Sequence, residues 1–369
     1  MPLIHVNAGP DGPELHDRPG ALQDHLPGML APMLSGDGPV IVMVHGFKYA
    51  PYHPRECPHR QILSMDPTRD CFKVVSWPRG LGFGRGSADE GLGIGFGWSA
   101  RGTLRQAYGE AARAGDGLAW LIAMIRRIAP GRPVHAVAHS LGARVVLQAL
   151  PHLPAGAVGR LILLAGAEFG GRAAEALDTP AGRCAEVINV TSRENDLFDF
   201  LLECLIPPPA RGNRSLGLAL PSGPGVLNLQ MDHPGTLAAL RGAGFEIGAP
   251  VTRICHWSPY TRPGALAMYD RLCCERPRSC RWHSCAPPCR MARHRAGHGF
   301  CRGRHSCPPR GRASGPVCDA GTGTPGARAT FPRRATQALV SRPCHIFPTV
   351  RARFPLSRQM PHCSKDRTA

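Results

Sequence analysis

A serine near the middle of the chain, Ser140, lies where an apolar run meets a helical pattern. Residues 134–138 read as a buried strand, and a helix is expected from residue 141 on. A sharp strand-to-helix turn strains the serine backbone and lifts the hydroxyl off the sheet, so the residues two before and two after it must be small. Ala138 and Gly142 meet that requirement. The pattern favours a nucleophilic serine over an ordinary helix-capping one.

A serine nucleophile works with a base that a third, acidic side chain orients. Such an acid is expected past a later strand, and Asp196 comes soon after the apolar run 187–191. Its rivals are Glu194 and Asp199, but Asp199 falls within the apolar run 197–202, where the helical period points it away from the end of the sheet. We therefore expect Asp196 to be the acid.

Two histidines that follow this acid are candidates for the base. His233 comes directly after the apolar run 226–230, a place that suits a residue at the edge of a sheet. His256 precedes residues 262–272, which read as the closing helix of the domain. Both satisfy the chain order of serine, acid and histidine, so residue types and order leave the base open.

A further motif, His-Gly-Phe at residues 45–47, ends an earlier apolar run. Together with the small-x-Ser-x-Gly turn, it resembles the alpha/beta-hydrolase superfamily, whose motif usually has Gly where this chain has Ala138. The resemblance covers about residues 38–272 and implies the alpha/beta-hydrolase fold. It also implies an oxyanion hole built from the backbone N–H groups of Phe47 and Leu141, and such donors are commonly the largest catalytic contribution.

The resemblance also favours one base. In members of the superfamily similar to this chain, a histidine followed by an aromatic residue ahead of the last helix is catalytic, which matches His256 and Trp257 and leaves His233 as runner-up. The implied chemistry is acyl transfer on a small-molecule ester: His256 takes the proton of Ser140, Asp196 fixes the imidazole, and water releases the acyl-enzyme. The mechanism calls for no metal and no organic cofactor.

Alternating strand and helix patterns position these residues. Short apolar runs, typical of strands buried on both faces of a parallel sheet, lie at 40–44, 72–76, 134–138, 161–165, 187–191 and 226–230. Helical patterns lie at 103–128, 141–150, 172–177 and 262–272. The order predicts an α/β protein with a mostly parallel sheet and helices on both faces. The Gly-rich segment 80–97 lacks a dinucleotide fingerprint and is expected to be a mobile surface or lid loop.

Charge divides the chain in two. Residues 275–369 carry 19 basic and 3 acidic side chains, which leaves 25 against 23 in residues 1–274. The nearly neutral body, residues 1–274, gives no reason to expect a specific nucleic-acid partner. No secretory signal and no membrane-spanning run is recognised, so a cytoplasmic location is the default expectation.

Residues 275–369 lose the apolar periodicity of the body and are rich in Arg, Pro and Cys, which predicts a disordered, basic, low-complexity tail. Its cysteine and histidine spacings lack the paired units of zinc sites. The relevant residues are Cys280, His283, Cys285, Cys289, Cys301, His305 and Cys307. The composition also fits a GC-rich coding sequence read in a shifted frame. Two alternatives to the enzyme stay open: a noncatalytic scaffold with the same fold, and polyanion binding through the tail.

Overall fold

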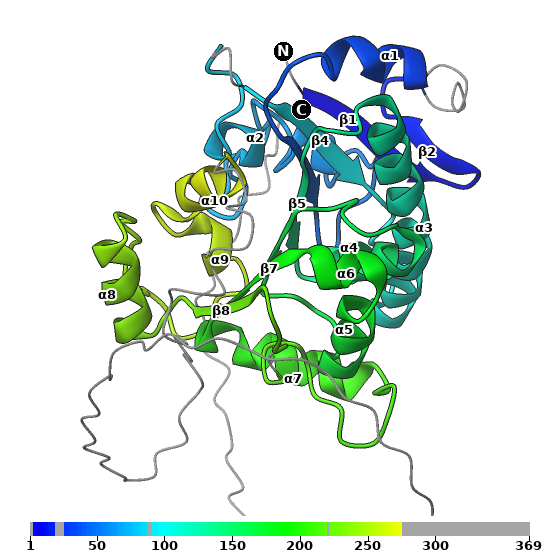
Figure 1. Ribbon diagram of the computed structural model, residues 1–369. Helices are drawn as coiled ribbons and strands as arrows, with labels where there is room; N and C mark the ends of the chain where they lie inside the picture. The colour runs from blue at the N-terminus through cyan, green and yellow to red at the C-terminus, as the bar shows by residue number, and fades with distance from the viewer. Residues whose placement is uncertain (1–2, 19–25, 87–89, 220, 275–369) are drawn as a thin grey trace, which may run out of the picture. The chain divides into compact units, whose positions relative to one another are not determined.

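One eight-stranded sheet organises the computed structural model, which describes residues 3–18, 26–86, 90–219 and 221–274 (Figure 1). The strand order is β2-β1-β4-β3-β5-β6-β7-β8, and only β1 and β2 pair antiparallel. The strands are β1 (Leu3–Gly9), β2 (Gly12–Leu15), β3 (Val40–Val44), β4 (Leu92–Gly97), β5 (Val134–His139), β6 (Arg160–Leu164), β7 (Glu186–Thr191) and β8 (Val226–Gln230). The predicted α/β class with a mostly parallel sheet is confirmed.

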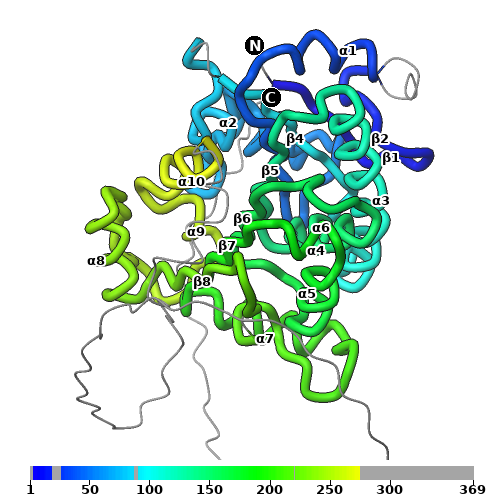
Figure 2. The backbone as a smooth tube through the Cα atoms, viewed as in Figure 1, coloured from blue at the N-terminus to red at the C-terminus, as the bar shows by residue number. Residues whose placement is uncertain are grey.

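Helices cover both faces of this sheet (Figures 1 and 2). The α-helices are α1 (Leu26–Met33), α2 (Trp77–Gly80), α3 (Leu104–Ile128), α4 (Leu141–Ala149), α5 (Gly170–Leu177), α6 (Pro180–Cys184), α7 (Asp196–Leu205), α8 (Pro234–Gly242), α9 (Ser258–Thr261) and α10 (Ala265–Cys274). Short 3₁₀ turns are η1 (Pro58–Arg60), η2 (Leu150–His152) and η3 (Arg193–Asn195).

The two faces of the sheet have separate hydrophobic cores. Val40, Val42 and Val44 of β3 pack with α1, α3, α4, α5 and α6, whereas Ile41 and Met43 pack on the other face with α2, α9 and α10. Successive side chains of a strand point to opposite faces, so a strand covered on both sides must be apolar throughout. This is why β3 reads as a continuous apolar run.

The predicted crossover helix has well-defined ends. Thr103 caps α3 in a reciprocal pair with Gln106, and Arg126 and Arg127 occupy its last turn. Such a capping box satisfies backbone N–H groups that a helix start leaves without partners. The other predicted helices, and the predicted strands other than residues 72–76, are also present with their ends shifted by a few residues at most.

Two sequence-based expectations are wrong. Residues 72–76 form a loop and not a strand, because Ser76 instead begins α2 by accepting a hydrogen bond from the N–H of Arg79. The Gly-rich segment contains β4, a fully buried inner strand, so residues 92–97 are not a surface or lid loop. β-carbons on Gly93, Gly95 and Gly97 would lie 3.1 Å from Cδ1 of Leu3, 3.0 Å from Cδ2 of His5 and 2.5 Å from Nε2 of His59, which explains why this face of β4 carries only glycines.

The sheet also begins earlier than the sequence pattern suggests. The hairpin of β1 and β2 adds two strands before residue 38, and β1 pairs in parallel with β4. The predicted tail, residues 275–369, lies outside the described residues. In the part of the chain that the structure describes, no helix is both long enough and apolar enough to cross a membrane.

Candidate active site

Ser140 occupies the turn between β5 and α4 in a strained conformation, with φ 56° and ψ −124°. A positive φ is uncommon for a residue that has a β-carbon and persists only where the surroundings enforce it. Here the N–H of Ser140 donates to the carbonyl of Leu164 (3.0 Å), and its own carbonyl accepts from the N–H groups of Ala143 (3.0 Å) and Ala167 (2.9 Å). The end of β6 therefore helps to hold the serine turn.

Small residues allow the serine turn to approach the loop after β3. A β-carbon on Gly142 would lie 2.7 Å from the carbonyl oxygen of His45, and one on Gly46 would lie 2.7 Å from Cβ of Ser140. Both distances are too short for real atoms, so each position requires glycine. Ala138, which stands where the usual motif has glycine, is fully buried.

His45 stabilises the loop that faces Ser140. Its Nε2 accepts a hydrogen bond from the N–H of Trp98 (3.1 Å), so Nδ1 carries the proton and donates to the carbonyl of Gly46 (2.9 Å). Burial lowers the pKa of His45 to about 4, which keeps the ring neutral at neutral pH. The ring also stacks on Trp98 with 5.5 Å between centroids.

Two backbone donors flank the serine turn. Neither the N–H of Phe47 nor that of Leu141 has a hydrogen-bond acceptor among the described residues. Leu141 is the first residue of α4, where a helix cannot satisfy its own N–H groups. The next residue after Phe47, Lys48, has φ 78° and donates to the carbonyl of Ala100 (2.7 Å), which fixes the loop. Both N–H groups suit an oxyanion hole.

His256 lies beside the serine turn. Its ring stacks on Phe198 of α7 (4.6 Å between centroids) and meets the ring of His139, the residue before Ser140, at 4.5 Å. Its Nδ1 lies 2.6 Å from Oδ1 of Asn195. An amide oxygen only accepts hydrogen bonds, so Nδ1 carries the proton and Nε2 presents a lone pair. That tautomer is the one a general base requires.

Burial decides the charge of this imidazole. It lowers the pKa of His256 well below the usual 6.5, and the neighbouring His139 lowers it further. Burial also lowers the pKa of His139 to about 4, and its Nε2 contacts the backbone carbonyl of His256 at 2.9 Å. Both rings are therefore neutral at neutral pH, so Nε2 of His256 keeps its lone pair.

The side chain that contacts Nδ1 of His256 is the amide of Asn195, which comes one residue before the predicted acid, Asp196. Asn195 ends η3 and is buried, whereas Asp196 begins α7 with a side chain that is 42% exposed and lies 3.7 Å from Nε of Arg193. Residue type alone does not identify Asn195, because an amide is not an acid. Its only signal in the sequence is its position directly before Asp196.

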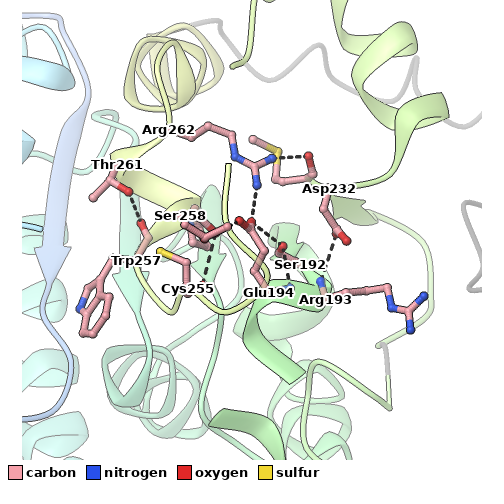
Figure 3. Close-up of polar contacts among 12 residues, drawn as sticks. Ser192, Arg193, Glu194, Asp232, Cys255, Trp257, Ser258, Thr261 and Arg262 are labelled. Atoms are coloured by element: carbon pink, nitrogen blue, oxygen red, sulfur yellow. Dashed lines mark hydrogen bonds and ion pairs between the residues drawn. The ribbon is translucent and has the colours of Figure 1, made fainter. Parts of the chain in front are cut away.

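A buried ion pair between Glu194 and Arg262 joins the segments that carry Asn195 and His256 (Figure 3). The Glu194 carboxylate also accepts from the hydroxyl of Ser192 (2.9 Å), and its backbone carbonyl accepts from the N–H of Cys255 (2.9 Å). The pair is 3% and 4% exposed. Glu194, a rival for the acid in the sequence, thus holds the loop of His256 and does not orient its ring.

The other candidate base, His233, lies at the start of helix α8. His233 caps α8, because its Nδ1 accepts from the N–H of Thr236 (3.4 Å), and its side chain is exposed. The adjacent Asp232 accepts from the N–H of Arg193 (3.1 Å), a contact drawn in Figure 3. The structure therefore places His256 next to the serine turn and His233 at a helix start.

Within residues 3–18, 26–86, 90–219 and 221–274, no three His, Cys, Asp or Glu side chains are grouped to hold a metal ion. Around the serine turn the structure provides the hydroxyl of Ser140 on a strained backbone and the neutral imidazole of His256. It also provides the backbone N–H donors of Phe47 and Leu141. No protein-family model matches the chain, and a search of the curated proteins finds no match. Function is therefore inferred from the geometry of the site itself.

Proposed function

We propose that the chain is a serine hydrolase of the alpha/beta-hydrolase type that cleaves a carboxylic ester or a related acyl bond. The strained backbone of Ser140 beside the buried, neutral ring of His256 is the observation that carries the proposal. In this mechanism Nε2 of His256 takes the hydroxyl proton, Ser140 attacks the carbonyl, and the N–H groups of Phe47 and Leu141 stabilise the oxyanion. The imidazolium of His256 gives this proton to the departing alkoxide, which leaves as the alcohol, and water then hydrolyses the acyl-enzyme to the free acid and Ser140.

Asn195 takes the orienting role that the sequence assigned to Asp196. Its amide oxygen fixes the tautomer of His256 through the 2.6 Å contact at Nδ1. It adds no negative charge, so the imidazolium formed during the reaction gains less stabilisation than a carboxylate would give. The base is correspondingly weak and stays unprotonated into the acidic range.

Covalent labelling with a fluorophosphonate tests this proposal. We expect the full chain to be labelled and to hydrolyse 4-nitrophenyl butyrate, and Ser140→Ala to lose both properties. Ser35→Ala is the matched control, since Ser35 is exposed and bonds only to the carbonyl of Pro32 among the contacts described. Label that persists in Ser140→Ala would contradict the assignment of the nucleophile.

One observation favours a second candidate, a noncatalytic binding scaffold. The partner of His256 at Nδ1 is a neutral amide and not the carboxylate usual in this mechanism. A folded chain that takes no fluorophosphonate label would support the scaffold. The third candidate, polyanion binding, rests on residues 275–369, which lie outside the described part of the chain.

A further inference from the structure

Two strained residues lie at the ends of neighbouring strands. Ser140, after β5, has φ 56°, and Ala165, after β6, has φ 44°. The N–H of Ser140 donates to the carbonyl of Leu164 (3.0 Å), and the N–H of Ala165 donates to the carbonyl of Val190 (2.9 Å). A residue with a β-carbon keeps a positive φ only where its surroundings enforce it. The serine turn therefore needs a rigid support beside it.

The segment after β6 packs closely on α4 and holds the carbonyl of Ser140. That oxygen accepts from the N–H of Ala167 (2.9 Å) as well as from the N–H of Ala143 in α4 (3.0 Å). A β-carbon on Gly166 would lie 3.0 Å from Cβ of Ala143, so the two segments approach closely there. Both N–H groups reach the same oxygen only while residues 165–168 stay in place on α4.

A buried ion pair joins these two segments one residue further along each of them. Arg144 follows Ala143 and pairs with Glu168, which follows Ala167. The two side chains are 7% and 0% exposed. The carboxylate of Glu168 also accepts from the N–H of Phe169 (2.7 Å). The pair therefore connects the same two segments whose N–H groups bind the serine carbonyl.

Tyr108 of α3 completes this buried network. Its ring lies against the guanidinium of Arg144, with 3.7 Å from Cζ to the ring centroid, and its backbone carbonyl accepts from Nε of Arg144 (2.8 Å). Its hydroxyl donates to the carboxylate of Glu168. Burial and that carboxylate raise the pKa of Tyr108, so the hydroxyl keeps its proton and remains a donor. Helices α3 and α4, which cover the same face of the sheet (Figure 1), are thus tied to the segment after β6.

Stability alone does not account for charged groups at this place. The surrounding core is apolar, with side chains such as Ala107, Phe169 and Ala173. Burying a guanidinium and a carboxylate costs desolvation energy that their attraction often only offsets, so apolar residues of similar volume would stabilise this part of the core as well. Hydrogen bonds and ion pairs add a fixed geometry, because each contact has a required direction.

We infer that the network of Tyr108, Arg144 and Glu168 enforces the strained backbone of the nucleophile and thereby positions its hydroxyl beside His256. The three are positioning residues, because they act through the two N–H groups that bind the carbonyl of Ser140. The inference rests on the proposed function, since it concerns the nucleophile of the same site. Without the ion pair the serine turn relaxes, and its hydroxyl leaves the orientation that the reaction requires.

The double variant Arg144→Met/Glu168→Met tests the inference. It leaves no buried ion without its counter-charge, so we expect the chain to stay folded by circular dichroism. The second-order rate of fluorophosphonate labelling at Ser140 should fall roughly tenfold or more, because a misplaced nucleophile loses the advantage of orientation. On 4-nitrophenyl butyrate, kcat should fall while KM changes little. Arg160→Met/Glu186→Met is the matched control, since it removes a pair at the start of β6 and β7 (2.6 Å) and should keep the labelling rate.

Tyr108→Phe is the milder variant, because it removes one hydroxyl and keeps the ion pair. Its labelling rate should fall roughly threefold, since the carboxylate of Glu168 loses one buried donor. A folded double variant that is labelled at the wild-type rate overturns the inference. A control pair that slows labelling equally also overturns it, because the effect would then be one of general stability. If the double variant does not fold, the rate of Tyr108→Phe decides: a reduced rate supports the inference, and an unchanged rate overturns it.

Amide hydrogen exchange at Ala143 and Ala167, followed by NMR, measures the support of the serine turn without any chemistry. Exchange of the N–H of Ala167 should be roughly tenfold faster in the double variant than in the wild type, since the segment after β6 opens more easily. The control pair should leave this exchange unchanged. A wild type that takes no label contradicts the proposed hydrolase, and hydrogen exchange then decides the inference alone. Equal exchange at Ala167 in the wild type and the double variant overturns it.

Discussion

At His256, the residue at Nδ1 determines how strongly the ring holds a proton. Asn195 is uncharged and the site is buried, so nothing offsets the desolvation that lowers the pKa of His256 below 6.5. Activity should require the neutral ring. The rising limb of kcat/KM against pH is therefore expected below pH 6.5.

Asn195→Asp tests this explanation. A carboxylate beside the ring favours the imidazolium, so the pKa of His256 rises and the limb moves to higher pH. The pH dependence of kcat/KM for 4-nitrophenyl butyrate measures the shift. Asp196→Asn is the neighbouring control, and because Asp196 is 42% exposed we expect it to leave the limb in place. A limb that moves only in Asp196→Asn would return the orienting role to Asp196.

At the scale of elements, the ion pair of Glu194 and Arg262 connects η3 to the segment that follows His256. Arg262 also donates to the carbonyl of Met231 at the end of β8. A single buried pair thus fixes three chain segments, one of which carries His256. The position of His256 relative to the serine turn depends on this connection.

Glu194→Gln should lower both stability and kcat. Removing one partner leaves Arg262 buried without its counter-charge, which costs about 3–5 kcal/mol of unfolding free energy, and the loop of His256 loses its anchor. Urea denaturation and steady-state kinetics measure the two effects. KM should change less than kcat, because the ring acts in the chemical step.

Glu186→Gln provides a matched control, because it removes an ion pair at the end of β7 that lies opposite to Glu194. Glu186 begins β7 and pairs with Arg160 at the start of β6 (2.6 Å), so its loss should reduce stability without reducing kcat. The double variant Glu194→Gln/Arg262→Met removes both charges of the site pair. We expect it to regain stability but not kcat, and full recovery of kcat would show that the pair is only structural.

Across the whole molecule, several histidines are buried in neutral form. Burial lowers the pKa of His45, His135 and His139 to about 4, against 6.5 for the exposed side chain. Below pH 6.5 the unfolded chain binds protons that the folded chain does not. Stability is therefore complete above pH 6.5 and declines as the pH falls towards 4, by about 1.4 kcal/mol for each pKa unit of difference.

Urea denaturation across this pH range measures the decline. His135→Gln should flatten it, since glutamine offers an acceptor for the N–H of Arg160, which now bonds to Nδ1 of His135 at 2.9 Å, and cannot be protonated in the unfolded chain. His135 lies in β5 close to its start, away from the serine turn, so activity is a control. An unfolding free energy that does not change between pH 6.5 and 4 would refute the linkage.

Local sequence was sufficient for five of the eight strands, β3 and β5 to β8, and for the serine turn. An apolar run such as β3 reports burial on both faces, and Thr103 with Gln106 marks the start of α3. These signals are local, because strand burial and helix capping depend on residues close in sequence. The β4 strand escaped detection because glycine has no side chain through which a pattern can report burial.

Only the tertiary structure identified the group next to the base. Asn195 and His256 lie 61 residues apart, and which side chain of residues 194–196 reaches Nδ1 depends on the rotation of η3 and the anchor at Glu194. Residue type favoured a carboxylate, yet the turn directs Glu194 towards Arg262 and leaves Asp196 beside Arg193. Sequence determined the α/β class, most of the elements and the serine turn, whereas long-range packing selected the contact on which the proposed chemistry depends.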